Sequence, residues 1–335
     1  MTERNIHPRK ARRDFLKAKR AVNKHSTYRA YKFPTRDFIE FLEAEGAESM
    51  QEVDGYLIEQ WKLSRQAEGI APATFRSNVK QMKTFIGWCE SSSIIEIGIT
   101  DNIEVPTISE DDQASDEHIS HQRAQSILSY LDTYHYATRK HALFSLLWET
   151  GCRISGAMAL DVGDFDATER KIEFVDRRED GTALKNGRKG ERNVTISEDL
   201  TGLLTDYIEV RRHDVRDEHN RRPLFTTVHG RMPRQRAYKN ITGYTRPCEY
   251  ENECPHNKAI ETCEWAKKKV AYGCPSSISL HPVRRGSITH HLNSGWPKDK
   301  VSDRCDVSVD VLEKHYNEQS KEDERETRMK YVDRL

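Results

Sequence analysis

No stretch of the 335-residue sequence approaches the roughly 18 consecutive apolar residues that a membrane-spanning helix needs. The N-terminus also lacks the apolar core of a secretory signal. The seven cysteines are an odd number, which fits a reducing compartment where thiols stay free or bind metal. We therefore expect an intracellular, cytoplasmic protein with no membrane partner.

An excess of charge of one sign is also missing, since 54 Lys and Arg residues balance 54 Asp and Glu residues. Net charge therefore gives no evidence about a nucleic-acid partner. The distribution is uneven, because residues 4–29 are strongly basic and residues 40–54 are acidic. This pattern predicts a surface that faces phosphates on one side only, although a solvated amphipathic helix explains it equally well.

Length and periodicity indicate two mainly helical domains. Apolar positions recur at helical spacing from about residue 10 to about residue 92, whereas Ser, Asp and Glu accumulate over residues 91–120. We expect an all-helical domain over 1–105, a linker over 106–118 and a second domain over 119–335. Two β-like runs, at 171–177 and 192–197, flank a Gly- and Lys-rich connection and predict a β-hairpin. The expected fold class is mainly α with a small hairpin or sheet.

The stretch "LHPVRRGSITHHLNSG" sets His281 and Arg284 three positions apart, on one face of a predicted helix. His281 is expected to be the N-cap, with Pro282 at the first helical position. Orphan amides, the helix dipole and a guanidinium together favour a bound phosphate. Taken alone, such a pair is more often a solvated face.

Three further motifs support a functional role for His281 and Arg284. They are "TGCR" with Arg153, "ALKNGRKGE" with Lys185 in the hairpin connection, and "DVLEKHY" with Tyr316. Taken singly, each residue has a commoner structural explanation: Arg153 as a helix cap, Lys185 as a solvated loop charge and Tyr316 as a half-buried helical aromatic. Lys189 lies in the same connection and is an alternative to Lys185.

In this order the motifs resemble the catalytic domain of the tyrosine recombinases, the phage integrases and Xer-type resolvases, over residues 119–320. The helical segment before them is similar to the core-binding domain of that family. The detail of "SDRCDVSVDVLEKHY" resembles archaeal, particularly haloarchaeal, members. The resemblance implies an all-helical core-binding domain and a mixed α+β catalytic domain, which together clamp double-stranded DNA.

The resemblance also implies roles. Cleavage of a phosphodiester without a metal needs a nucleophile, neutralised phosphate charge and an acid for the leaving oxygen, and each requirement has a candidate here. Tyr316 is expected to form a 3'-phosphotyrosine link, Arg153 and Arg284 to clamp the phosphate, His281 to donate a hydrogen bond or shuttle a proton, and Lys185 to protonate the leaving 5' oxygen. No catalytic cofactor is expected. The partners implied are double-stranded DNA and a homotetramer on two DNA sites, with a monomer or dimer off DNA. The alternatives are a DNA-binding regulator that has lost the chemistry and a relaxing topoisomerase.

Two positions depart from the pattern of the family. The acidic residue usual three positions after the first arginine is Gly156 here, so the orientation of that arginine must come from elsewhere. The Gly-His step usual ten and nine positions before the tyrosine is Asp306-Val307. The hydrogen bond of that second histidine is therefore missing or made by another residue.

A cysteine-containing insert lies over residues 248–274. Four thiolates there suffice for a tetrahedral zinc site that would hold a loop too short to bury its own core. The spacings lack a C-x-x-C pair, so free thiols are the competing interpretation, and His256 is a possible replacement ligand. The predicted ligands are Cys248, Cys254, Cys263 and Cys274.

Overall fold

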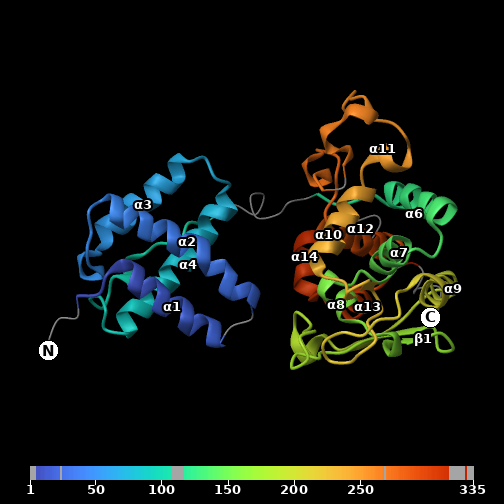
Figure 1. Ribbon diagram of the computed structural model, residues 1–335, viewed down its shortest axis with the longest axis horizontal. Helices are drawn as coiled ribbons and strands as arrows, with labels where there is room; N and C mark the ends of the chain where they lie inside the picture. Colours follow the sequence, from blue (N-terminus) through green and yellow to red (C-terminus); the bar gives the residue numbers. More distant parts are fainter. Residues whose placement is uncertain (1–4, 23–24, 108–116, 268, 317–328, 330–335) are drawn as a thin grey trace. The chain divides into compact units, whose positions relative to one another are not determined.

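The computed structural model describes residues 5–22, 25–107, 117–267, 269–316 and 329. The chain separates into two compact units, Met1–Ser115 and Asp116–Leu335 (Figure 1). Most of the expected linker, residues 106–118, lies outside the described residues. In the part of the chain that is described, no helix has the length and apolar character to cross a membrane.

The N-terminal unit is built from helices whose starts are marked by capping residues. The Asp54 side chain accepts a hydrogen bond from the backbone N–H of Leu57, Ser49 and Glu52 form a capping box, and Pro72 opens the last long helix. The helices are α1 (Pro8–Val22), α2 (His25–Ala44), α3 (Gly55–Ala67) and α4 (Pro72–Ser91), with short 3-10 turns at η1 (Met50–Glu52) and η2 (Thr100–Asn102).

The apolar positions that predicted these helices form the core of this unit. Phe15 meets Phe85 edge to face with ring centroids 5.1 Å apart, and Phe38 meets Trp61 in the same way at 5.5 Å. Most of these apolar positions are buried, and Leu57 and Trp88 are partly buried against the same cluster. The buried ones are Tyr31, Phe38, Leu42, Trp61, Phe75, Val79, Met82 and Phe85.

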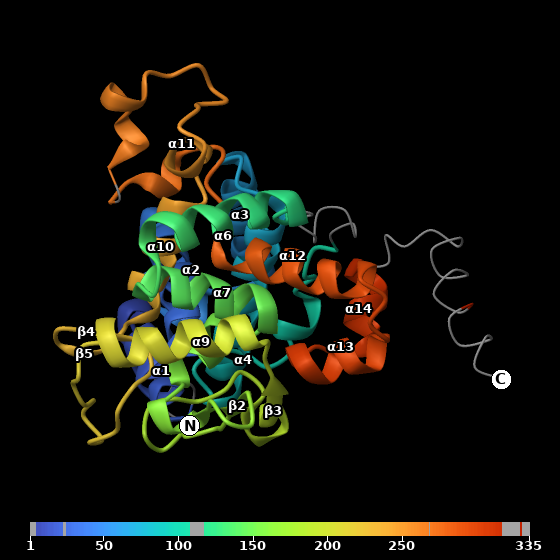
Figure 2. The same cartoon turned by 90° about the vertical axis from the view of Figure 1, so that its right-hand side faces the viewer.

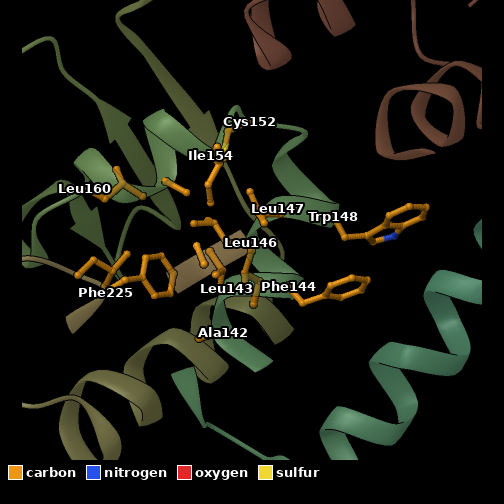
Figure 3. Packing of buried hydrophobic residues seen from close by; sticks show 14 of the residues in the cluster. Ala142, Leu143, Phe144, Leu146, Leu147, Trp148, Cys152, Ile154, Leu160 and Phe225 are labelled. Carbon is orange, nitrogen blue, oxygen red and sulfur yellow. The ribbon is translucent and has the colours of Figure 1, made fainter. Parts of the chain in front are cut away.

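The second unit surrounds the central helix α7 with further helices (Figure 2). Helix α12 packs beside both α6 and α7. Leucines of α7 pack with Ile154 and Phe225 in the main core (Figure 3). The helices are α6 (His121–His135), α7 (Arg139–Thr150), α8 (Ile154–Ala159), α9 (Glu198–Asp206), α10 (Arg234–Tyr244), α11 (Pro247–Tyr250), α12 (Leu280–Asn293), α13 (Lys298–Cys305) and α14 (Val309–Tyr316).

The predicted β-hairpin is confirmed. Strand β2 (Lys171–Phe174) pairs antiparallel with β3 (Arg192–Thr195), and β1 (Phe165–Asp166) adds a strand on the other side of β2. Ile172 lies opposite Val194, and both are buried in the main core. A second small ribbon joins β4 (Thr226–Thr227) to β5 (Gly230–Arg231). The fold class is thus mainly α with a small antiparallel sheet, as predicted.

The predicted start of the helix that carries His281 is wrong by two residues. Helix α12 begins at Leu280, with Ser279 as its N-cap, so His281 and Pro282 lie inside the first turn. Proline is tolerated there because the first N–H groups of a helix have no intrahelical acceptor.

The cysteine-containing insert has almost no apolar core of its own. Of its described residues, only Ala271 is buried. It contains the short turns η6 (Ile260–Thr262), η7 (Glu264–Ala266) and η8 (Ala271–Gly273). Arg123 of α6 holds both of its ends, because its guanidinium donates to the Tyr250 hydroxyl at 3.0 Å, to the carbonyl of Thr245 at 2.5 Å and to the carbonyl of Ser276.

Candidate active site

The glycine of the T-G-C-R motif is required by geometry. Gly151 follows the end of α7 with a left-handed φ of +58° and donates its N–H to the Leu147 carbonyl. A Cβ at this position would lie 2.7 Å from Cys305 Sγ and 3.1 Å from Ser287 Oγ. Glycine therefore permits both the turn and the close approach of α12 and α13, directly before Arg153.

Arg153 reaches the turn that follows α13. Its Nη1 donates to the carbonyl oxygen of Asp306 at 2.5 Å and makes an ion pair with the Asp306 carboxylate. Arg153 occupies the N-cap position of α8 but makes no capping hydrogen bond with its side chain. The side chain keeps 31% of its surface exposed, so an external phosphate has access to it.

Arg284 lies one turn after His281 on α12 and is buried. Its Nη1 donates to the carbonyl oxygens of Gly151 at 2.6 Å and Cys305 at 2.7 Å. Its Nη2 lies 3.3 Å from the carbonyl of Asp306. Both motif arginines therefore converge on the turn at 305–306, and Arg284 also binds the turn that precedes Arg153.

His281 lies at the N-terminal end of α12 and is exposed at the surface. Its pKa is nevertheless lowered, first by neighbouring atoms that displace water and then by the positive charges of Arg284, Arg285 and Arg153. The ring is therefore predominantly neutral near pH 7 in the DNA-free protein. Phosphate bound in the same place would raise that pKa, because its charge is negative.

The connection between β2 and β3 is joined to the same turn. Asn186 donates from Nδ2 to the Asp306 carboxylate at 2.7 Å. Lys185, directly before Asn186, is exposed, and so is Lys189 within η4 (Gly187–Gly190). The structure thus brings the lysine-containing connection to the arginines, while both lysines stay at the surface.

Tyr316 is the last residue of α14, which starts three residues after the turn at 305–306. Helix α14 packs against α13, the helix that ends at this turn. The position of the Tyr316 side chain lies outside the described part of the structure. Its role therefore remains a prediction.

Motif analysis missed two residues that hold these parts together. Asp306 contacts both motif arginines and Asn186, and the sequence shows it only as a departure from the family pattern. Arg192 of β3 donates to the carbonyl of Arg304 at 2.8 Å and to that of Gly190 at 2.9 Å, and its guanidinium lies 4.2 Å from the ring centre of Phe174. Arg192 thereby links the hairpin to α13.

The predicted zinc site is not supported. Among the described residues, no three His, Cys, Asp or Glu side chains lie close enough together to hold a metal ion. Three of the four predicted ligands lie in different short elements. Cys248 is in α11, Cys263 lies between η6 and η7, and Cys274 is at the end of η8. Cys254 lies in the loop after α11, and His256 is instead within 2.9 Å of the Ser276 hydroxyl.

The basic N-terminal segment is partly neutralised within its own unit. Arg9 makes an ion pair with Glu43 of the acidic segment at 2.5 Å, and Lys10 pairs with Asp14 at 2.8 Å. Helix α1 also buries one apolar face, including Phe15 and Leu16. Helix α1 is therefore amphipathic, which agrees with the alternative interpretation. The expectation that the basic segment faces phosphates stays a prediction.

Comparisons with known proteins identify the family of the second unit and a relative of the chain. The sequence model of the phage integrase family matches residues 117–322. A tyrosine recombinase XerC from Herpetosiphon aurantiacus is 24% identical over 234 residues, which cover 69% of this chain and 72% of that protein. The expected likeness to archaeal members stays a prediction.

Solved structures share the fold at low sequence identity. The Tn1549 transposon integrase in complex with a circular intermediate DNA has a TM-score of 0.68 at 15% identity and covers 98% of this chain and 99% of its own. The recombinase XerH, bound to a palindromic difH substrate, has a TM-score of 0.65 at 15% identity and covers 93% and 82%. The chain therefore belongs to the phage integrase family: it is a tyrosine recombinase, an enzyme that breaks and rejoins DNA strands.

Proposed function

We propose that the protein is a site-specific recombinase in which Tyr316 attacks a DNA phosphodiester and forms a 3'-phosphotyrosine link. The observation that carries this proposal is the convergence of Arg153 and Arg284 on the turn at 305–306, from which the chain passes into the helix that ends at Tyr316. As a tyrosine recombinase, the chain needs no metal ion or cofactor for the chemistry.

Each bond change has a candidate residue. The phenolic oxygen of Tyr316 forms the bond to phosphorus, while the bond from phosphorus to the 5' oxygen breaks. Arg153 and Arg284 stabilise the negative charge on the non-bridging oxygens, because guanidinium groups match phosphate geometry. His281, neutral before DNA binds, donates a hydrogen bond to the same phosphate or shuttles a proton. Because the phosphotyrosine link retains the energy of the broken bond, rejoining needs no external energy source.

We assign the protonation of the departing 5' oxygen to Lys185 rather than Lys189. Lys185 directly precedes Asn186, whose side chain is bound to the turn that both arginines contact. A general acid must be held within hydrogen-bond reach of its target, and the fixed neighbour restricts the positions open to Lys185. Lys189 lies in the next 3-10 turn, three residues beyond that bond.

The inferred partner is double-stranded DNA. The solved structures with this fold include an integrase in complex with DNA and a recombinase bound to a palindromic substrate. We infer that four protomers act on two DNA sites and exchange strands pairwise through a Holliday junction, with a monomer or dimer off DNA. The reaction is expected to take place in the cytoplasm.

A recombination assay separates this function from the two alternatives. A supercoiled plasmid that carries two directly repeated copies of a candidate attachment site is incubated with the protein. A recombinase deletes the segment between the copies and releases a second circle. A topoisomerase relaxes the plasmid even without the sites, and a regulator binds the sites without changing the DNA. Deletion lost in Tyr316→Phe supports the proposal, while relaxation or binding alone contradicts it.

A further inference from the structure

We propose that Asp306 is a positioning residue that holds Arg153 and the Lys185 connection in register for DNA cleavage. This inference rests on the proposed function. It connects the two positions at which the sequence departs from the family pattern, because an acidic residue is missing at Gly156 and a new one stands at 306. The carboxylate that orients the first arginine would then come from the turn before α14.

Asp306 makes contacts with three separate segments. Its carbonyl oxygen accepts from Arg153 Nη1 at 2.5 Å and lies 3.3 Å from Arg284 Nη2. One carboxylate oxygen pairs with Arg153, and the other accepts from Asn186 at 2.7 Å. A single carboxylate therefore joins the T-G-C-R turn to the lysine-containing connection.

The backbone at this position favours glycine over aspartate. Asp306 caps the end of α13 with φ at +54° and ψ at +59°, in the left-handed region that glycine adopts most easily. Aspartate is tolerated there at some conformational cost. The ion pair with Arg153 offsets the conformational cost of an aspartate at this position, where glycine would fit better.

The position of the missing acid is crowded by apolar atoms. A Cβ at Gly156 would lie 3.3 Å from Cδ1 of Phe174 and 4.0 Å from Cδ2 of Leu184, two buried apolar residues. An acidic side chain there would crowd the apolar contact between α8 and the hairpin. The arginine is therefore oriented from its other neighbour, the turn at 306.

This arrangement leaves Arg153 able to bind DNA. Its contacts with Asp306 use Nη1, and a guanidinium carries five N–H donors on three nitrogens. Fixing one nitrogen restricts the plane of the guanidinium and directs the remaining donors. Because transition-state stabilisation depends on preorganised donors, losing the restraint should slow cleavage more than it weakens binding.

A matched pair of variants tests the proposal. Asp306→Asn and Asp303→Asn each remove one negative charge from the same region of α13, and Asp303 is exposed. Asparagine also tolerates the left-handed conformation. The measured quantities are the single-turnover rate of covalent complex formation on a nicked suicide duplex, the Kd for the intact duplex and the thermal midpoint of unfolding.

We expect Asp306→Asn to slow covalent complex formation by about 10- to 100-fold, the scale of a misplaced catalytic group, with the Kd changed by less than about twofold. Asp303→Asn should match the unmodified protein. Asp306→Gly, which suits the positive φ, should be equally slow without a lower unfolding midpoint. If both variants at position 306 cleave as fast as the unmodified protein, or faster, the positioning role is wrong.

The unmodified protein serves as the reference that separates this inference from the proposed function. If the unmodified protein gives no covalent complex on any duplex, the proposed chemistry itself fails. If it gives the complex and the variants at 306 give it at the same rate, only the positioning role fails. A parallel loss of rate, DNA affinity and unfolding midpoint in Asp306→Gly would show a merely structural residue and would also overturn the inference.

Discussion

Arg284 of α12 donates a hydrogen bond from Nη1 to the carbonyl oxygen of Gly151, 2.6 Å away. The same nitrogen donates to the Cys305 carbonyl, so one buried arginine joins the turns on either side of the site. Arg284 therefore has two tasks in this account: it shapes the site in the absence of DNA, and it binds the phosphate when DNA is present.

Replacing Arg284 should affect both tasks. Lysine keeps the charge but lacks the planar fork, so Arg284→Lys leaves a buried carbonyl without its donor. We expect the free energy of unfolding to fall by about 1–3 kcal/mol and covalent complex formation to slow. Urea unfolding and the suicide-duplex assay measure the two effects. The exposed Arg178→Lys is the control and should change neither.

Gly151→Ala should destabilise the second unit. The substitution places a methyl group 2.7 Å from Cys305 Sγ at a residue with φ of +58°. Overpacking together with the strained turn should cost about 1–3 kcal/mol. Gly202→Ala, inside α9 with no atom within 4 Å of the new Cβ, should instead raise stability by up to about 1 kcal/mol. Equal effects at both positions would contradict the packing described around Gly151.

Lys185 and Lys189 are distinguished by the chemistry of the leaving group. Lys185→Ala should slow cleavage by roughly 10²–10⁴-fold, the usual contribution of a general acid. A duplex with sulfur in place of the bridging 5' oxygen should restore the rate, because a thiolate leaves without protonation. Lys189→Ala should cleave both duplexes at the unmodified rate. Rescue in Lys189→Ala but not in Lys185→Ala would move the acid to the later position.

Stability should fall at acidic pH because of buried histidines. Burial lowers the pKa of His141 and of His291, whose Nδ1 lies 2.7 Å from the Ser287 carbonyl. The unfolded chain has histidines with a pKa of about 6.5 and binds protons that the folded protein resists. The free energy of unfolding should therefore be highest above that pH and fall as pH decreases below it.

Urea unfolding at about pH 7.5 and about pH 5.5 measures this dependence directly. His291→Gln removes one of the buried groups and should narrow the difference between the two pH values, whatever its effect on stability at either one. A pH dependence that is unchanged in this variant would show that His291 does not contribute to it.

Local patterns predicted the helices and the hairpin well. The buried positions of α4 recur at helical spacing, and β2 and β3 alternate around Ile172 and Val194, so short-range periodicity sufficed. The start of α12 was misplaced because proline is compatible with several positions in a first turn, and Ser279 precedes it.

Contacts between distant residues were beyond the reach of local patterns. The sequence marked Asp306 as unusual, but nothing in its spacing indicates that it pairs with Arg153 or binds Asn186. The cysteines show a second limit of local patterns, because four thiols in one short stretch suggested a shared metal, and among the described residues no three possible ligands come together to hold one. In both cases the decisive information is tertiary geometry.

Covalent trapping tests the central claim most directly. The protein and its Tyr316→Phe variant are each incubated with nicked suicide duplexes that carry candidate attachment sites, and the products are separated on a denaturing gel. The account predicts a DNA-linked protein band that is absent in Tyr316→Phe. In this band the protein is joined to the 3' phosphate of the cleaved strand. Tight binding without any covalent band, or a band that persists in Tyr316→Phe, would contradict it.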